Sequence, residues 1–207
     1  MAKNELTAAE KIAQLANDPK YQLMLRRKEE SQKKQHEALA LDQREFVAEC
    51  SAIGIQIQSV WDLVNSTSSY LQVIPVLVAH LNKPHLPRTV EGIVRALITP
   101  ESQGLAFDSL VNVFKQTPIA ELELKWLLGA AIAESATPSD LETIVELSKD
   151  LSHGRGREFL PLGLVVSATN RSLCILEVMS NDPALAKNAK KAIKLIRTRM
   201  NKQKRES

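Results

Sequence analysis

Residues 86–100, LPRTVEGIVRALITP, carry the clearest helical pattern of the chain. Their apolar side chains recur every three or four positions, which places them on one face of an α-helix. Glu91 and Arg95 stand one turn apart on another face, where opposite charges can pair. Pro87 suits the first turn of a helix, where its missing N–H is not needed. The stretch therefore predicts a helix from residue 87 to 98. Its buried face comprises Val90, Ile93, Val94, Leu97 and Ile98.

Prolines punctuate the chain where further helices should begin. Thr-Pro pairs stand at residues 99–100, 117–118 and 137–138, and Asp-Pro at 18–19 and 182–183. A Thr or Asp side chain caps the N-terminus of a helix, and proline tolerates the first turn that follows. Each interval between the Thr-Pro pairs holds one segment of helical length. The chain is therefore predicted to be all-α.

Consecutive helical segments pair into four predicted hairpins. The second helices begin at intervals of a little over thirty residues, which indicates a structural repeat. The hairpins comprise residues 69–81 with 87–98, 105–115 with 119–134, 139–151 with 157–168, and 172–180 with 183–199. In the third hairpin Pro161 interrupts the expected second helix. That helix either starts late, near Glu158, or is kinked at the proline.

Residues 74–98, IPVLVAHLNKPHLPRTVEGIVRALI, resemble a HEAT repeat. An apolar first helix, a short turn and a second helix with the step Val94-Arg95-Ala96-Leu97 carry the resemblance, which extends over residues 69–199. The chain also looks like small bacterial HEAT-repeat proteins that have a charged N-terminal helix and no assigned activity. The resemblance implies a right-handed α-solenoid of about four HEAT-like helical hairpins with an N-terminal helical extension.

Four regions are predicted along the chain. Residues 1–18 form a short helix, with Thr7 and Glu10 as its capping box, or are flexible. Residues 19–66 comprise a long charged helix and a segment that caps the repeats. The HEAT-like domain spans residues 67–200, and residues 201–207 form a flexible basic tail. Residues 26–37 contain no apolar side chain, so a solvated helix is expected there rather than a coiled coil.

Composition indicates a globular protein without a membrane segment. Of 207 residues, 44% are apolar but only 4% are aromatic, which disfavours a β-sandwich or barrel. No secretory leader and no run of eighteen apolar residues is visible. Cys50 and Cys174 lie far apart among apolar neighbours, which favours buried reduced thiols over a disulfide or metal ligands. A cytoplasmic location is predicted.

No catalytic constellation is found in the sequence. No two of His36, His80, His85 and His153 lie three or four residues apart with a Cys or carboxylate to complete a zinc site, and His80 is expected to have a hydrogen-bonding role. No metal and no cofactor is predicted. Trp126 is assigned to the core. Trp61 next to Asp62 is compatible with a base-gripping pair, as in helical-repeat DNA glycosylases, or with an ordinary short helix. The protein is predicted not to be an enzyme.

The loop Ser-His-Gly-Arg-Gly-Arg at 152–157 admits two interpretations. Gly154 follows a predicted helix where a glycine commonly ends it, and Gly156 permits a tight reversal, so the loop is explained as a turn. Arg155 and Arg157 precede the positive end of the next helix, where an anion would stabilise them. A plain turn is favoured over a phosphate grip.

Basic charge is concentrated at the C-terminal end. Residues 51–150 contain six basic and eleven acidic side chains, and residues 151–207 contain twelve and four. Between Lys187 and Arg205 there are nine basic residues and no acidic one. On a helix these side chains oppose an apolar face. They form either a binding surface for an anionic partner or a solvated cap.

The resemblance implies where a partner binds, because second helices of HEAT stacks line the concave side. The predicted partner-binding residues are Arg88, Glu91, Arg95, Lys125, Arg155, Arg157, Lys187, Lys191 and Lys194. The first hypothesis is a non-enzymatic scaffold that binds an acidic protein, with a regulatory or immunity role in a bacterial setting. The alternatives are a nucleic-acid-binding or helical-repeat DNA repair protein and, third, a modifying enzyme on a HEAT scaffold.

Overall fold

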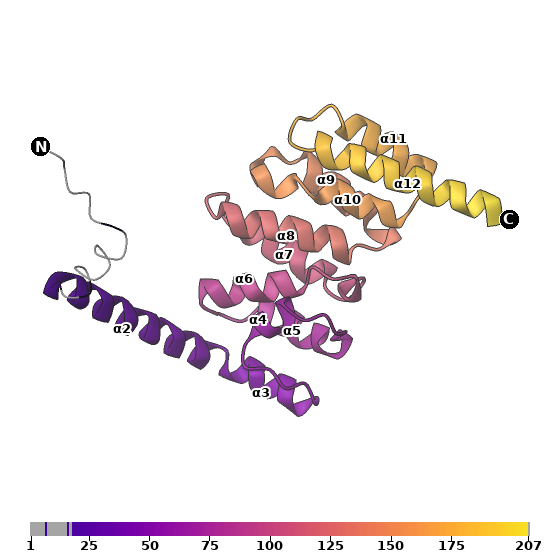
Figure 1. The fold of residues 1–207 in the computed structure, drawn as a ribbon. Helices are drawn as coiled ribbons and strands as arrows, with labels where there is room; N and C mark the ends of the chain where they lie inside the picture. Colours follow the sequence, from indigo (N-terminus) through magenta and orange to yellow (C-terminus); the bar gives the residue numbers. More distant parts are fainter. Residues whose placement is uncertain (1–6, 8–15, 17, 207) are drawn as a thin grey trace, which may run out of the picture. The chain divides into compact units, whose positions relative to one another are not determined.

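A computed structural model of the chain describes residues 7, 16 and 18–206. All elements of regular structure in this part are helices, which confirms the predicted all-α class (Figure 1). None of these helices is long and apolar enough to cross a membrane. The α-helices are α2 (Pro19–Asp42), α3 (Arg44–Ala52), α4 (Val60–Val64), α5 (Ile74–Leu81), α6 (Pro87–Ala96), α7 (Phe107–Gln116), α8 (Leu122–Ser135), α9 (Leu141–Lys149), α10 (Leu160–Gly163), α11 (Asn170–Met179) and α12 (Ala186–Glu206). Short 3-10 helices are η1 (Leu71–Val73), η2 (Pro100–Ser102), η3 (Pro138–Asp140), η4 (Leu151–Arg157) and η5 (Leu164–Val166).

The chain forms two compact units, Met1–Asp42 and Gln43–Ser207. In the first unit, α2 begins at the predicted Asp18-Pro19 step, where the Lys20 backbone N–H donates to Asp18 Oδ1 at 2.8 Å. No residue of α2 is buried, and residues 26–37 are all exposed, as expected for a helix segment without apolar side chains. The predicted capping box of Thr7 and Glu10 involves residues outside the described part.

The second unit consists of helices packed in succession (Figure 1). α5 packs on α6, α7 on α8, α9 on α10 and α11 on α12. The second member of each pair also contacts the next, so α6, α8, α10 and α12 follow one another in contact. Ahead of them α3 packs on α5 and α4 on α6, so these two helices belong to the same body. The structure thus divides the chain after residue 42, whereas the sequence predicts a boundary after residue 66.

Proline starts some helices but not all those predicted. Pro87 lies in the first turn of α6 and Pro138 in that of η3, as expected. The predicted N-cap at Thr117 is wrong. Its hydroxyl donates to the Val113 carbonyl at 2.7 Å and so closes the end of α7, while α8 starts only at Leu122. A Thr side chain can serve either helix end, because it both donates and accepts hydrogen bonds.

The glycine-rich loop before α10 is a turn packed tightly against α8. Gly154 has φ of 52°, a backbone conformation that favours glycine. Gly156 brings its carbonyl against α8: a Cβ at Gly129 would lie 2.0 Å from that oxygen. Helix α10 begins at Leu160 with Pro161 in its first turn, so of the two predicted arrangements the late start is confirmed.

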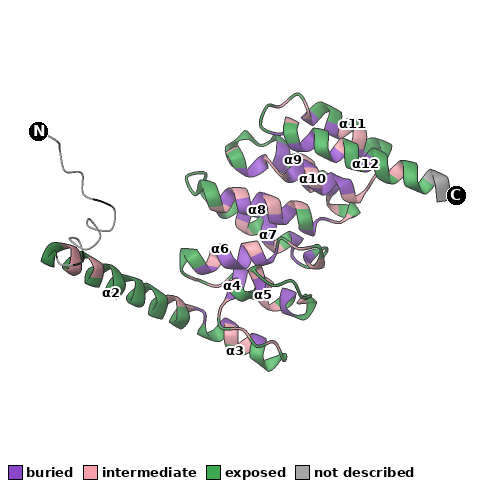
Figure 2. Ribbon diagram, viewed as in Figure 1, coloured by how far each residue is buried: buried purple, intermediate pink, exposed green. Residues whose placement is uncertain are grey.

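Both members of the helix pairs contain buried residues (Figure 2). Cys50 belongs to this core, as predicted, and burial raises the pKa of its thiol to about 11, with a smaller contribution from the Glu49 carboxylate. The prediction of a buried Cys174 is wrong, because this thiol is exposed. Helix α11 buries the face formed by Ser172, Leu176 and Met179, and position 174 lies outside it.

Candidate partner-binding surface

Helix α12 has one apolar face and one basic face. Its apolar face packs on α10 and α11. Leu185, just ahead of the helix, and Ala189, Ala192 and Ile196 are buried there, as the spacing predicts. Lys187, Lys191 and Lys194 follow at i, i+4 and i+7 on the other side, and all three are exposed. These three lysines are called the basic stripe.

The basic stripe is not neutralised within the protein. Among the residues that the structure describes, none of its three lysines forms an ion pair. Neighbouring basic side chains do have partners: Arg197 lies 3.3 Å from the carboxylate of Glu177, and Arg199 donates to the Val165 carbonyl at 3.0 Å. The charge of the stripe therefore remains available to an anionic surface.

A groove of about 370 Å³ lies beside the basic stripe. Helix α12 contributes Lys191, Leu195 and Arg199 to its lining, while α8 contributes Glu134 and η5 contributes Val165. Leu195 is 42% exposed, so an apolar side chain is open to solvent between two basic ones. The groove can thus receive an apolar group that is flanked by negative charge.

The three predicted residues of α6 are brought together. Arg88 Nη1 and Arg95 Nε each donate to the Glu91 carboxylate at 2.9 Å. Burial of Glu91 opposes its ionisation, but the hydrogen bonds from Arg95 and Arg88 outweigh burial and lower its pKa. Arg88 also stacks on Trp61, 3.6 Å from the ring centroid. Part of the positive charge of α6 is therefore compensated inside the cluster.

Trp61 and Asp62 form no free recognition pair. The Asp62 carboxylate accepts the backbone N–H groups of Ser59 at 3.0 Å and Gln58 at 2.7 Å, and so caps α4. The Trp61 ring is covered on one side by the Arg88 guanidinium. The short-helix interpretation of this pair agrees with these contacts.

Arg155 is exposed but lies close to two carboxylates. Its guanidinium is 5.2 Å from the ring centroid of Trp126, 3.5 Å from Glu123 and 3.6 Å from Glu158. Trp126, predicted to belong to the core, is half-buried, packs edge-on against Phe159 and donates from Nε1 to Glu158 at 2.9 Å. Arg155 thus packs over Trp126, and the two nearby carboxylates compensate much of the charge that a partner could use.

Lys125 and Arg157 are the two predicted surface residues that the structure buries. Lys125 is 3% exposed, and its ammonium donates to the carbonyl of Thr117 at 2.7 Å. Arg157 is 6% exposed and donates to Asp182 Oδ2 and to the Ser148 carbonyl, each at 2.8 Å. Their assignment to the binding surface is wrong, because internal acceptors hold both cations. The loop before α10 is therefore a structural turn.

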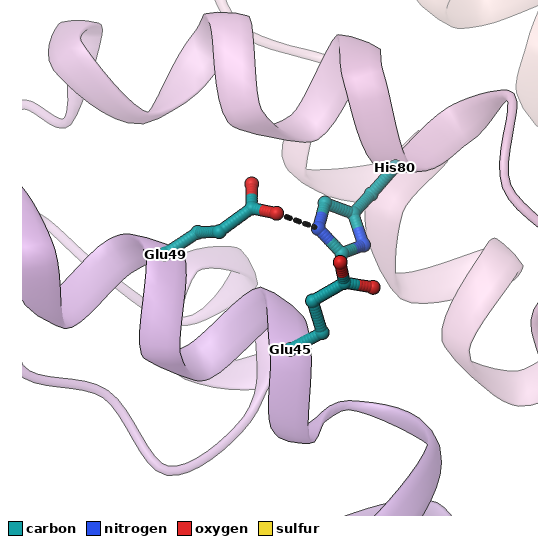
Figure 3. A group of neighbouring side chains, drawn as sticks. All are labelled: Glu45, Glu49 and His80. Carbon is teal, nitrogen blue, oxygen red and sulfur yellow. Dashed lines mark ion pairs between the residues drawn. The ribbon is translucent and has the colours of Figure 1, made fainter.

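A separate polar cluster joins α3 to α5 (Figure 3). Glu45 and Glu49 lie one turn apart on α3, and His80 lies in the last turn of α5. One potential metal-ligand atom from each of these residues lies within 4.8 Å of the other two. The ammonium of Lys83 lies between them. This group was not predicted from the sequence, because helix packing brings together residues that no local spacing relates.

His80 has the predicted hydrogen-bonding role. Its side chain is fully buried, and burial lowers its pKa, although the hydrogen bond with Glu49 opposes this. Nδ1 lies 3.0 Å from His85 Nε2, so the two imidazoles are hydrogen-bonded. The Phe46 ring packs edge-on against His80, with centroids 5.3 Å apart.

No family model, curated protein or solved structure matches this chain. Membership of the HEAT-repeat family therefore stays a prediction from residues 69–199.

Proposed function

We propose that the protein is a non-enzymatic binding module that holds an acidic protein partner on its C-terminal basic surface. In this proposal the second unit is a right-handed α-solenoid, and its four HEAT-like hairpins are α5–α6, α7–α8, α9–α10 and α11–α12. The succession of contacts from α6 through α8 and α10 to α12 supports a stack of this kind.

The observation that carries the proposal is the basic stripe beside the groove. Three exposed lysines without an internal partner lie within three turns of one helix, and Lys191 also borders the groove. Complementary charge steers association, whereas a buried apolar anchor supplies most of the affinity. Acidic side chains on the stripe and an apolar side chain at Leu195 would together provide both.

The distribution of charge favours a protein over a nucleic-acid duplex. A duplex presents phosphates continuously along its length, and each contact requires a basic side chain. Residues 51–150, which contain α4 to α9, have a net charge of −5, so a duplex that followed the stack beyond α12 would meet repulsion. An acidic patch on a protein can be confined to the end of the array.

The test compares two charge reversals of equal size in the full chain. The triple variant Lys187→Glu, Lys191→Glu, Lys194→Glu reverses the basic stripe. Its control, Lys28→Glu, Lys33→Glu, Lys34→Glu, makes the same change on exposed positions of α2. Proteins cross-linked to the parent in cells are identified by mass spectrometry, purified, and their affinity is measured against all three chains and against a duplex of about 20 bp.

The expected result is an acidic protein whose affinity falls by a factor of about 10 to 100 in the stripe variant and is unchanged in the α2 control. Raising the salt concentration should mainly slow its association. An unchanged affinity in the stripe variant would show that the stripe is a solvated cap. Tight duplex binding that falls steeply with salt and is lost in the stripe variant would establish the nucleic-acid alternative instead.

A further inference from the structure

The cluster between α3 and α5 directs three electron-pair donors toward one point. Glu45 and Glu49 are separated by one helical turn and project from the same face of α3, and His80 faces them from α5 (Figure 3). Its Nε2 lies 3.3 Å from Glu49 Oε1. Tetrahedral zinc with bonds of roughly 2.0–2.2 Å separates its ligand atoms by roughly 3.3–3.6 Å. Glu49 and His80 already have this separation, and Glu45 is exposed enough to adjust.

Metal binding through Nε2 of His80 needs the tautomer that is protonated on Nδ1. Lys83 Nζ and Glu49 Oε1 both lie 3.3 Å from His80 Nε2; the ammonium needs a lone pair on this nitrogen, whereas the carboxylate needs an N–H. In the tautomer that accepts from Lys83, the imidazole proton is on Nδ1 and points to His85 Nε2, 3.0 Å away. A histidine that binds metal through one ring nitrogen commonly donates the other N–H to such a second partner. Full burial and the Phe46 ring hold its orientation.

One cation already occupies the point where the donors meet. Lys83 Nζ lies 3.1 Å from Glu49 Oε1 and 3.2 Å from Glu45 Oε1, besides its contact with His80. Three acceptors around a single ammonium show that this place stabilises positive charge. The Lys83 side chain is 35% exposed and has a flexible stem, so its ammonium can leave for water without disturbing α3 or α5.

We propose that Glu45, Glu49 and His80 form a site for one divalent metal ion of the zinc class, and that the Lys83 ammonium competes with this ion for the same position. One imidazole and two carboxylates are three ligands of the kind that zinc accepts, and water would supply the fourth. Calcium prefers six to eight oxygens, and magnesium an octahedral oxygen shell, so the imidazole disfavours both. The site is separate from the basic stripe and does not depend on the proposed function.

The test is a titration of the full chain with zinc chloride in competition with a chromophoric chelator. Lys83→Met removes the competing ammonium, and Glu49→Gln removes one ligand. Their matched controls are Lys115→Met and Glu142→Gln, which make the same changes at exposed positions outside the cluster. Because both Lys83 and Glu49 are partly exposed, these variants should fold, and circular dichroism checks that they do.

The parent is expected to bind one zinc ion, Lys83→Met to bind it about tenfold more tightly, and Glu49→Gln at least about tenfold more weakly. Cobalt should give the visible absorption of a tetrahedral ion in the parent and in Lys83→Met, and much less in Glu49→Gln. Equal affinities in the parent, Lys83→Met and Glu49→Gln would overturn the proposal. The proposal would also be overturned if the parent bound no zinc up to about 1 mM, even if Lys83→Met bound it, because the cluster would then serve only as an ion-paired contact between α3 and α5.

Discussion

Replacing Gly129 by alanine tests the contact between α8 and the loop before α10. An alanine Cβ at this position would lie 2.0 Å from the carbonyl oxygen of Gly156 and 3.1 Å from its carbon. Both are backbone atoms, so no side chain can turn aside to make room. The added methyl group would have to push the loop away from the helix.

Whether Gly129→Ala raises or lowers the free energy of unfolding depends on two opposing contributions. In a helix interior, glycine to alanine ordinarily stabilises by about 0.8–1.0 kcal/mol. Overpacking a close contact costs roughly 1–3 kcal/mol, and a Cβ separation well inside the 3.0 Å that real Cβ atoms respect places this cost at the upper end. Gly129→Ala should therefore lower the free energy of unfolding by about 2 kcal/mol, contrary to its helix propensity.

Urea denaturation followed by circular dichroism measures this change. The control is Ala130→Gly, the reverse replacement at the next, half-buried position of the same helix, which should cost about 1 kcal/mol through propensity. If Gly129→Ala unfolds at the same urea concentration as the parent, or at a higher one, the loop does not press on α8 and the account of the two glycines is wrong.

Three further outcomes are expected. A thiol reagent should label Cys174 within the folded protein, whereas Cys50, buried and with a raised pKa, should react only on unfolding. Burial, helped by nearby positive charge, lowers the pKa of His153, so on acidification the unfolded chain takes up a proton before the folded protein does. The free energy of unfolding should therefore decrease as the pH drops below about 6.5. His153→Gln should remove the part of this decrease that His153 causes. Trypsin should cut within residues 26–37 before it cuts within residues 74–166, because no side chain of that segment of α2 is buried.

For each of these three predictions, a specific result would contradict it. Equal labelling rates of the two thiols in the folded protein would show that position 50 opens readily. A His153→Gln variant with the same acid profile as the parent would assign the loss of stability to other groups. First cleavage within residues 74–166 would mean that residues 26–37 are covered by a partner or a second copy.

The helices and their buried faces were largely predictable from sequence. The face of α12 follows from residues spaced three and four apart, since that spacing is a property of any helix, and the outcome agrees at Ala189, Ala192 and Ile196. Cys174 shows the limit of the same rule. An apolar neighbourhood in α11 indicates a helix, but which side is covered depends on where α12 packs.

The candidate site was only partly predictable, because charge in the sequence does not show where charge is available. The sequence assigns Lys125 and Arg157 to a basic surface, yet both side chains are buried. Carbonyls and a carboxylate from other parts of the chain accept their hydrogen bonds. Those acceptors belong to other helix ends and turns, and only the packing brings them close. The basic stripe was predictable because its three lysines lie opposite the apolar face of their own helix, and the side that a helix leaves exposed follows from residue spacing alone.

The buried Arg157 also determines how a load on the C-terminal helix would be carried. Asp182, in the turn ahead of α12, is held by Arg157, which also holds the carbonyl of Ser148 in the last turns of α9. Asn188, in the first turn of α12, donates to the Glu158 carbonyl at 2.8 Å, one residue further along the same loop. A partner that pulled on the basic stripe would therefore act on a helix whose N-terminal end is bonded to the preceding pair. Force on the start of α12 therefore reaches α9 and α10 through two adjacent residues, Arg157 and Glu158, and both hydrogen bonds have to break before this end of the helix detaches.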